Sequence, residues 1–164
     1  MKRHDSMRGY FAYELYEQME KNKDIYLLVG DLGYKVFDAH RDNFPDRFIN
    51  CGASEQAMMG MSVGLALEGK IPFVYSITTF LLYRPFETIR NYVSHEKIPV
   101  KLIGSGRDRD YEHDGFSHHS EDAEQILECL PNIKCYWPNS KEQMKGLMHE
   151  LVTNNAPSFV SLRR

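Results

Sequence analysis

The segment Ile25-Tyr-Leu-Leu-Val-Gly-Asp31 decides the fold class of this chain of 164 residues. Its first five residues are uncharged and largely apolar, and the run stops at a Gly-Asp pair. This is the pattern of a strand buried on both faces of a parallel sheet. Similar runs recur along the sequence, and they predict further strands at Arg47–Cys51, Pro72–Ser76, Val100–Ile103, Ile133–Tyr136 and Phe159–Leu162.

Helical patterns lie between these apolar runs. They cover residues 8–21, 54–68, 80–95, 121–130 and 140–154, and Ser140 with Gln143 forms a candidate capping box at the last helix. Strands that alternate with single helices predict βα units, parallel strands and right-handed crossovers. We therefore predict one α/β domain over residues 1–164, a three-layer sandwich with a six-stranded, mostly parallel sheet.

Composition and charge exclude several classes of protein. Twenty basic and 23 acidic side chains leave a net charge of −3, which gives no basis for binding nucleic acid or an anionic membrane. The longest apolar run, 71–83, is shorter than the about 20 residues that span a bilayer, and no apolar signal core follows Met1. The three cysteines are too few and odd in number for a disulfide framework, so we expect reduced thiols and a cytoplasmic protein.

Parallel α/β sheets bind ligands outside the carboxyl ends of their strands. The loops expected there contain most of the unusual residues: Gly30–Tyr34, Gly52–Gln56, Thr78–Phe86 and Gly104–His119. Neither a GxGxxG motif after a strand nor a GxxxxGK[ST] motif is present, so the sequence gives no sign of an autonomous nucleotide-binding fold.

Glu55 stands where a predicted strand turns into a helix, just after Ser54, a candidate N-cap. The simplest interpretation of this window alone is a first-turn carboxylate that the helix dipole favours. The helix behind it contains Gly60 and Gly64, and each glycine weakens a helix by about 1 kcal/mol relative to alanine. We therefore expect another backbone, from a second subunit, to approach this helix closely.

Three further groups of residues could carry chemistry. Phe80, Tyr83 and Phe86 are spaced three apart, which suits either the core or stacking on a flat heteroaromatic ring. The polar loop 104–119 holds histidines and aspartates that suit hydrogen bonding to hydroxyls and proton transfer, but no second ligand pair completes a zinc site, so we predict no metal ligands. Scattered basic residues are surface charges unless several converge on a phosphate; they are Arg8, Lys35, Arg107, Arg109, Arg163 and Arg164.

Taken in order along the chain, these segments resemble the pyrimidine-binding domain of transketolase-type, thiamine-diphosphate-dependent enzymes. The resemblance runs from about Arg8 to the end of the chain. The motifs that carry it are Gly30-Asp31, Phe-Pro-x-Arg-Phe at 44–48, Gly-x-x-Glu-Gln at 52–56, Phe-x-x-Tyr-x-x-Phe at 80–86, Asp-Gly-x-Ser-His at 114–118, and Leu-Pro-Asn-Ile at 130–133 with Trp137-Pro138.

The resemblance implies a role for each site residue. Glu55 is implied to hydrogen-bond N1′ of the cofactor's aminopyrimidine and so to assist proton removal from the thiazolium carbon C2. The implied cofactor contacts also include Asp31, Phe80, Tyr83 and Phe86. His118 is implied to lie near the reacting oxygens of the substrate and Asp114 near a donor hydroxyl. Arg8 and Arg164 match positions where transketolases hold the sugar phosphate.

The sequence also departs from the family pattern. Gly106-Arg107 stands where transketolases carry a histidine, so we expect a phosphate subsite rebuilt with Arg107 or Arg109, or a different acceptor. The diphosphate-binding domain, whose Gly-Asp-Gly…Asn run holds Mg²⁺, and the carboxy-terminal domain have no counterpart in these residues. The resemblance therefore implies a split enzyme, in which a partner chain holds the diphosphate and Mg²⁺. The helix that contains Gly60 and Gly64 leads us to expect that the two chains form an α2β2 assembly.

The expected activity is transfer of a two-carbon ketol unit between sugars or sugar phosphates. One alternative is a subunit of a 2-oxoacid decarboxylase or of a deoxyxylulose-phosphate-synthase-like enzyme with the same cofactor. Another is a non-catalytic regulatory paralogue, against which the intact Glu55, Asp114 and His118 argue.

Overall fold

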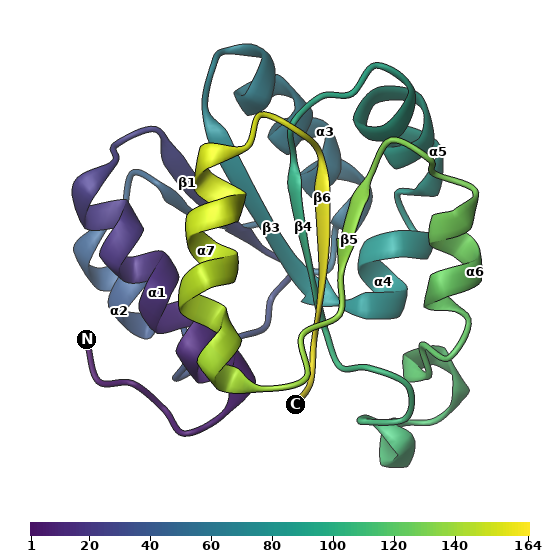
Figure 1. Ribbon diagram of the computed structural model, residues 1–164, viewed down its shortest axis with the longest axis horizontal. Helices are drawn as coiled ribbons and strands as arrows, with labels where there is room; N and C mark the ends of the chain where they lie inside the picture. The colour runs from purple at the N-terminus through teal and green to yellow at the C-terminus, as the bar shows by residue number, and fades with distance from the viewer.

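A computed structural model describes residues 1–164 and contains one six-stranded sheet. The strands are β1 (Ile25–Val29), β2 (Phe48–Asn50), β3 (Ile71–Ile77), β4 (Lys101–Ser105), β5 (Lys134–Tyr136) and β6 (Ser158–Leu162), in the spatial order β2-β1-β3-β4-β6-β5 (Figure 1). All six predicted strands are confirmed. All five strand pairs are parallel, so the sheet is parallel throughout rather than mostly parallel.

Helices cover both faces of the sheet. The face that carries α1 (Met7–Lys21) and α7 (Met144–Thr153) buries one hydrophobic cluster, and the face that carries α3 (Glu55–Leu67), α4 (Thr78–Tyr83) and α6 (Ala123–Glu128) buries a second (Figure 1). Strand side chains alternate between them, because successive residues of a strand point to opposite faces. Leu27 thus belongs to the first cluster and Leu28 to the second. The predicted three-layer sandwich is confirmed.

The prediction of one continuous helix at 80–95 is wrong, because the segment is divided into three shorter helices. The chain forms α4, then α5 (Phe86–Thr88), then a π-helix, η1 (Ile89–His95). Pro85 lies at the break; a proline has no N–H to donate and its ring clashes with the preceding helical turn. The aromatic residues of this segment therefore do not share a single helical face.

Several short elements connect the main ones. The sequence pattern did not predict α2 (Asp38–Asn43), which has only six residues. The loop after β4 contains two 3₁₀ turns, η2 (Glu112–Asp114) and η3 (Phe116–His118), and η4 (Lys141–Gln143) leads into α7. The capping box is confirmed, since the Gln143 side chain accepts from the Ser140 N–H at 3.1 Å. Ser54, in contrast, makes no side-chain cap at α3.

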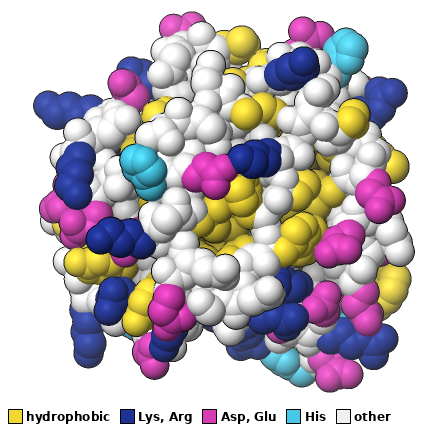
Figure 2. Space-filling view, viewed as in Figure 1, with side chains coloured by type: hydrophobic (Ala, Val, Ile, Leu, Met, Phe, Trp, Pro, Cys, Tyr) yellow, Lys and Arg dark blue, Asp and Glu magenta, His cyan; other side chains and the backbone are white.

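None of the helices combines the length and the hydrophobicity that are needed to span a membrane. Hydrophobic side chains gather on one face over the edge strand β5, between α7 and α6 (Figure 2). Hollows of about 420 and 290 Å³ lie there, and both include Trp137 in their walls. Because β5 has only three residues, this edge of the sheet presents few unpaired backbone groups.

Candidate active site

The carboxyl ends of all six strands meet at one edge of the molecule, the lower edge in Figure 1. The loops after β1, β2, β3 and β4 therefore bring together the four segments that the sequence singled out. The residues that follow β6, Arg163 and Arg164, reach the same edge. The predicted position of the site is the edge at which parallel sheets bind ligands.

Glu55 is the first residue of α3, yet its side chain is only 2% exposed. One carboxylate oxygen, Oε1, accepts a hydrogen bond from the Ser76 hydroxyl at 3.4 Å, and the other, Oε2, accepts from Nη1 of Arg84 at 2.7 Å. A buried charge needs a partner because leaving water is costly. Glu55 therefore lies in the first turn of α3, as expected, and is also a buried carboxylate paired with Arg84.

Gly30, at the end of β1, makes room for this carboxylate. A Cβ atom on Gly30 would lie 3.0 Å from the Ser76 hydroxyl oxygen and 3.5 Å from Oε1 of Glu55. A side chain here would push on Ser76 and Glu55 together. The packing of Ser76 and Glu55 thus explains why a glycine stands at position 30.

The three aromatic residues after β3 have three different environments. Phe80 lies under the Arg84 guanidinium, whose carbon is 3.8 Å from the ring centre, and meets the edge of the His118 ring at 4.9 Å. Tyr83 donates its hydroxyl to Asp122, and burial raises the pKa of that hydroxyl. Phe86, beyond the break at Pro85, packs against the core cluster under α3. Only Phe80 therefore lies directly beside both Arg84, the partner of Glu55, and His118.

The loop after β4 supplies His118 and Asp114. The His118 ring lies between Phe80 and Tyr111, with ring centres 4.9 and 6.1 Å away, and its Nδ1 is 3.0 Å from the Ser117 hydroxyl. Asp114 is exposed, and its carboxylate is 3.3 Å from Nε2 of His113. The structure thus joins His118 to the aromatic wall and leaves Asp114 at the surface.

Tyr111 is a site residue that the sequence reasoning missed. Its hydroxyl accepts from Nη1 of Arg8 at 3.2 Å and lies 2.9 Å from the Ser105 hydroxyl, and the Arg164 guanidinium covers its ring at 4.9 Å. Tyr111 thereby unites the two predicted phosphate-binding arginines, Arg8 and Arg164. Its position as the one aromatic residue in the charged run 107–114 was the signal that could have identified it.

The two arginines around Tyr111 keep unused donors. Nε of Arg8 is buried and has no hydrogen-bond partner. Nη1 of Arg164 lies 3.4 Å from Nε2 of His113, at the surface. An oxyanion placed here would meet guanidinium groups from the two ends of the chain.

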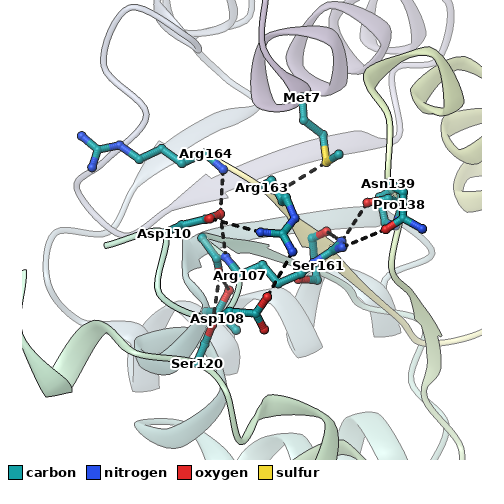
Figure 3. A network of polar contacts seen from close by, with 12 residues as sticks. Met7, Arg107, Asp108, Asp110, Ser120, Pro138, Asn139, Ser161, Arg163 and Arg164 are labelled. Atoms are coloured by element: carbon teal, nitrogen blue, oxygen red, sulfur yellow. Dashed lines mark hydrogen bonds and ion pairs between the residues drawn. The ribbon is translucent and has the colours of Figure 1, made fainter. Parts of the chain in front are cut away.

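Arg107, which the sequence offered as one candidate for a rebuilt phosphate subsite, makes its contacts within the chain. Its side chain donates to the Ser161 hydroxyl at 3.0 Å, the Ser161 carbonyl at 2.6 Å, the Pro138 carbonyl at 2.9 Å and Oδ1 of Asn139 at 3.4 Å (Figure 3). Burial lowers its pKa. Arg109 is also engaged, because it pairs with Glu121 at 2.9 Å on the surface. The donors of Arg107 are thus used within the chain, whereas Arg109 is held only by surface pairs.

Asp110 fastens the chain end to this loop. Its carboxylate accepts from the N–H of Arg107 at 3.0 Å, the N–H of Arg164 at 2.9 Å and the side chain of Arg163 at 3.4 Å (Figure 3). Arg163 also pairs with Asp108 at 3.1 Å. We call this set, residues 107, 108, 110, 163 and 164, the clasp.

The structure explains why a glycine stands at position 106. Gly106 has φ +84°, a left-handed conformation that side chains rarely adopt, and a Cβ there would lie 2.3 Å from the Tyr111 ring. The Tyr111 ring fills the space next to the backbone. A histidine at this position is therefore incompatible with the loop.

Asp31 lies at the β1–β2 end of the same edge. Its carboxylate accepts from the Tyr34 hydroxyl at 2.5 Å and the Asn50 amide at 3.1 Å, and the Tyr34 hydrogen bond holds its pKa below the usual value. Asn50 in turn accepts from the N–H groups of Asp31 and Gly52. These contacts fix the two loops that flank Glu55.

Three other features bear on ligands and partners. The structure brings together no three His, Cys, Asp or Glu side chains that could hold a metal ion. A Cβ built on Gly60 or Gly64 would meet nothing within 4 Å, so the close backbone expected at these glycines does not come from this chain. A cavity of about 540 Å³ beside η1 includes none of the predicted site residues.

A parallel sheet with a buried carboxylate, an aromatic side chain and a pair of arginines at its carboxyl edge defines a ligand-binding α/β domain. Residues 5–164 match the family model described as the transketolase pyrimidine-binding domain, and the chain belongs to this family. The resemblance to this family that the sequence motifs indicated is therefore confirmed.

Its relatives include transketolase subunits. The chain is 31% identical over 159 residues to the "putative transketolase C-terminal section" of Methanocaldococcus jannaschii, covering 96% of this chain and 50% of that protein. It is 28% identical over 159 residues to the 6-deoxy-6-sulfo-D-fructose transketolase subunit SqwH of Clostridium sp. strain MSTE9, covering 96% and 49%. The chain thus spans about half the length of these curated relatives.

Solved structures agree. A split-gene transketolase, described as an inactive beta4 tetramer, superposes with a TM-score of 0.84 at 28% identity, covering 97% of this chain and 51% of that one. The transketolase of Campylobacter jejuni superposes with a TM-score of 0.86 at 19% identity, covering 96% and 25%. The second likeness concerns the fold alone.

Proposed function

We propose that this chain supplies the pyrimidine-binding side of a split, thiamine-diphosphate-dependent transketolase, which transfers a two-carbon ketol unit between sugar substrates. The observation that carries the proposal is Glu55, a carboxylate that is 2% exposed at the ligand-binding edge of the sheet. Its one cationic partner, Arg84, is itself 45% exposed, so this buried charge depends on a contact that a ligand could replace.

The residues fit an aminopyrimidine ring. A buried carboxylate oxygen can accept from, or share a proton with, a ring nitrogen, and the face of Phe80 offers a flat apolar surface. Thiamine diphosphate, when bound, supplies the centre that stabilises the carbanion. Glu55 would hold the proton shared with the ring, and Phe80, Tyr83, Phe86 and Asp31 with its loop would form the walls.

A sugar phosphate would meet the other half of the edge. Arg8 and Arg164 converge on Tyr111, and Nε of Arg8 is a buried donor without a partner. We assign the phosphate subsite to these two arginines and not to Arg107, whose donors are used within the chain. His118, against Phe80, would contact the reacting oxygens, and Asp114 a donor hydroxyl.

A partner chain would complete the enzyme. We propose that a separate diphosphate-binding chain holds Mg²⁺ and the diphosphate, as the family resemblance implies. The bare surface at Gly60 and Gly64 supports contact with another subunit, and we propose an α2β2 assembly. Three unpaired cysteines support a cytoplasmic location.

The test is Glu55→Gln in the enzyme assembled with its partner. Glutamine has nearly the same shape and can still hydrogen-bond the ring, but it cannot share a proton, so we expect turnover to fall by 10²–10⁴-fold, or about 3–5 kcal/mol of barrier. Hydrogen–deuterium exchange at C2 of the bound cofactor, measured by quenched NMR, should slow by a similar factor.

His118→Ala is the matched control, since it should slow turnover while leaving C2 exchange near the wild-type rate. The chain without its partner should bind the cofactor weakly and turn over nothing. Wild-type C2 exchange in Glu55→Gln would refute the role of Glu55 and the proposed function with it.

A further inference from the structure

We infer that Arg84 is a positioning residue whose guanidinium occupies the site of the pyrimidine ring on Glu55 and Phe80 while the cofactor is absent. The guanidinium moves away from both side chains when the ring binds. The inference rests on the proposed function, because it concerns the entry of that ring. It assigns a role to a residue that the sequence motifs did not include. Three observations support it.

The first observation concerns which oxygen of Glu55 is reachable. Oε1 points toward the strand ends, where it accepts from Ser76 at 3.4 Å and lies 3.5 Å from the Cβ position of Gly30. Oε2 is the oxygen that Arg84 holds, at 2.7 Å. The Arg84 side chain is 45% exposed, so its guanidinium lies between Oε2 and water on at least one side. A ring nitrogen that needs Oε2 therefore competes with Arg84.

The second observation concerns Phe80. The guanidinium carbon of Arg84 lies 3.8 Å from the centre of the Phe80 ring, which is a cation–π contact. An aromatic heterocycle would stack on the same face. One side chain thus covers both the carboxylate of Glu55 and the face of Phe80.

The third observation is that Arg84 is lightly held. Glu55 is its one hydrogen-bond partner, whereas Arg107 donates to four acceptors and is 7% exposed. A half-exposed guanidinium keeps much of its hydration, so releasing it into water is inexpensive. Arg84 also directly precedes Pro85, where the helical hydrogen bonds are interrupted. These features are those of a residue that can swing away.

The two functions of Arg84 predict effects of opposite sign. Without Arg84, Glu55 is a buried carboxylate with no cation, so the folded chain should lose stability. Ring binding should improve, because the fraction of molecules with an open site rises and the apparent dissociation constant falls by that factor. A residue with a merely structural role would weaken folding and binding together.

The experiment uses Arg84→Gln, with Arg90→Gln as the control. Arg90 is an exposed arginine six residues further on that bonds only the Asn91 side chain. For the chain alone, urea unfolding should show the unfolding equilibrium constant raised about tenfold by Arg84→Gln and unchanged by Arg90→Gln. In a Glu55→Gln background, the effect of Arg84→Gln should largely disappear, since no buried charge remains to be paired.

Binding is measured by calorimetry on the chain assembled with its diphosphate-binding partner, with thiamine diphosphate and Mg²⁺ as the probe. Arg84→Gln should lower the dissociation constant about 3- to 10-fold, and Arg90→Gln should not change it. Arg84→Lys, which keeps a cation beside Glu55 but not the flat cover over Phe80, should fold like the wild type and show a smaller gain. If Arg84→Gln folds poorly, the dissociation constant of Arg84→Lys still tests the inference.

Weaker or unchanged binding in both Arg84 variants would overturn the inference, as would the absence of coupling between positions 55 and 84. If the wild-type assembly binds no thiamine diphosphate, the proposed function fails instead. The coupling between Glu55 and Arg84 is measured by urea unfolding of the chain alone, so it does not depend on that result.

Discussion

The two ends of the carboxyl edge differ in how their buried charges are satisfied. At the β4–β6 end, Arg107 is 7% exposed and donates hydrogen bonds to Ser161, Pro138 and Asn139. Asp110 at this end accepts hydrogen bonds from three N–H groups of the clasp. At the β1–β3 end, Glu55 is 2% exposed and has one cation, which is itself half in water. A group whose contacts are complete within the chain serves the scaffold, and a group left with one removable partner is available to a ligand.

The largest effect should come from breaking the complete end. Arg107→Ala removes four hydrogen bonds and leaves the carbonyls of Pro138 and Ser161 without their donor. Buried acceptors that lose a charged donor are costly, and we expect the free energy of unfolding to fall by about 3 kcal/mol. Urea denaturation measures it. Arg109→Ala, which removes only surface pairs, should cost less than about 0.5 kcal/mol; equal losses in the two variants would remove the contrast between them.

The second prediction concerns His40, a buried group that belongs to neither pattern. Its ring is fully buried among Tyr16, Phe37 and Phe44, neither nitrogen has a well-formed hydrogen bond, and burial lowers its pKa from 6.5 to about 3. Between pH 6.5 and about pH 3, His40 is protonated in the unfolded chain and neutral in the folded chain. The contribution of His40 is therefore complete above pH 6.5 and declines as the pH falls.

From pH 7 to pH 5 this decline should reach about 2 kcal/mol of unfolding free energy. His40→Leu should remove that part of the pH dependence, and His149→Gln, at an exposed position, should not. Urea unfolding at the two pH values compares them. A wild-type slope that persists in His40→Leu would mean that other groups control the acid sensitivity.

The smallest effect should appear at α3, on the open end of the edge. Gly60→Ala places a methyl group in free space, and alanine favours a helix by about 1 kcal/mol, so the isolated chain should become more stable. If a second subunit packs on this helix, the same methyl group should weaken assembly. Gly146→Ala in α7 also meets nothing and is the matched control: it should stabilise equally and leave assembly unchanged. Light scattering of the coexpressed subunits reports the assembly, and equal assembly in both variants would refute the subunit contact.

Much of the fold was predictable because local physics and global topology agree. The run Ile25–Val29 has too few polar residues for any position except a two-sided core, and its partners repeat the pattern. The parallel order then placed Glu55, Phe80 and His118 at one edge without further information. The break at Pro85 was also within reach, since a proline interrupts a helix whatever the spacing of the aromatics around it.

Other parts of the site depend on contacts between residues distant in sequence. Arg84 pairs with Glu55 across 29 positions, and Arg107 reaches Ser161 across 54, so no local pattern announces either one. Each arginine looks like a surface charge in isolation. The same holds for Tyr111, whose importance comes from Arg8 and Arg164 at opposite ends of the sequence.

The place of β6 has a consequence for how the chain acquires its fold during synthesis. This strand is the last in sequence, yet it lies inside the sheet between β4 and β5. A growing chain on the ribosome can assemble β1, β2 and β3 early, but β5 has no neighbour and Arg107 no acceptor on Ser161 until residues 158–162 have left the exit tunnel. A domain in which an inner strand is translated after both of its neighbours exposes apolar surface until then, and long-range pairing is slow to form. For this protein, the β4–β6 end of the carboxyl edge should be the last part of the molecule to form, after the β1–β3 end that carries Glu55.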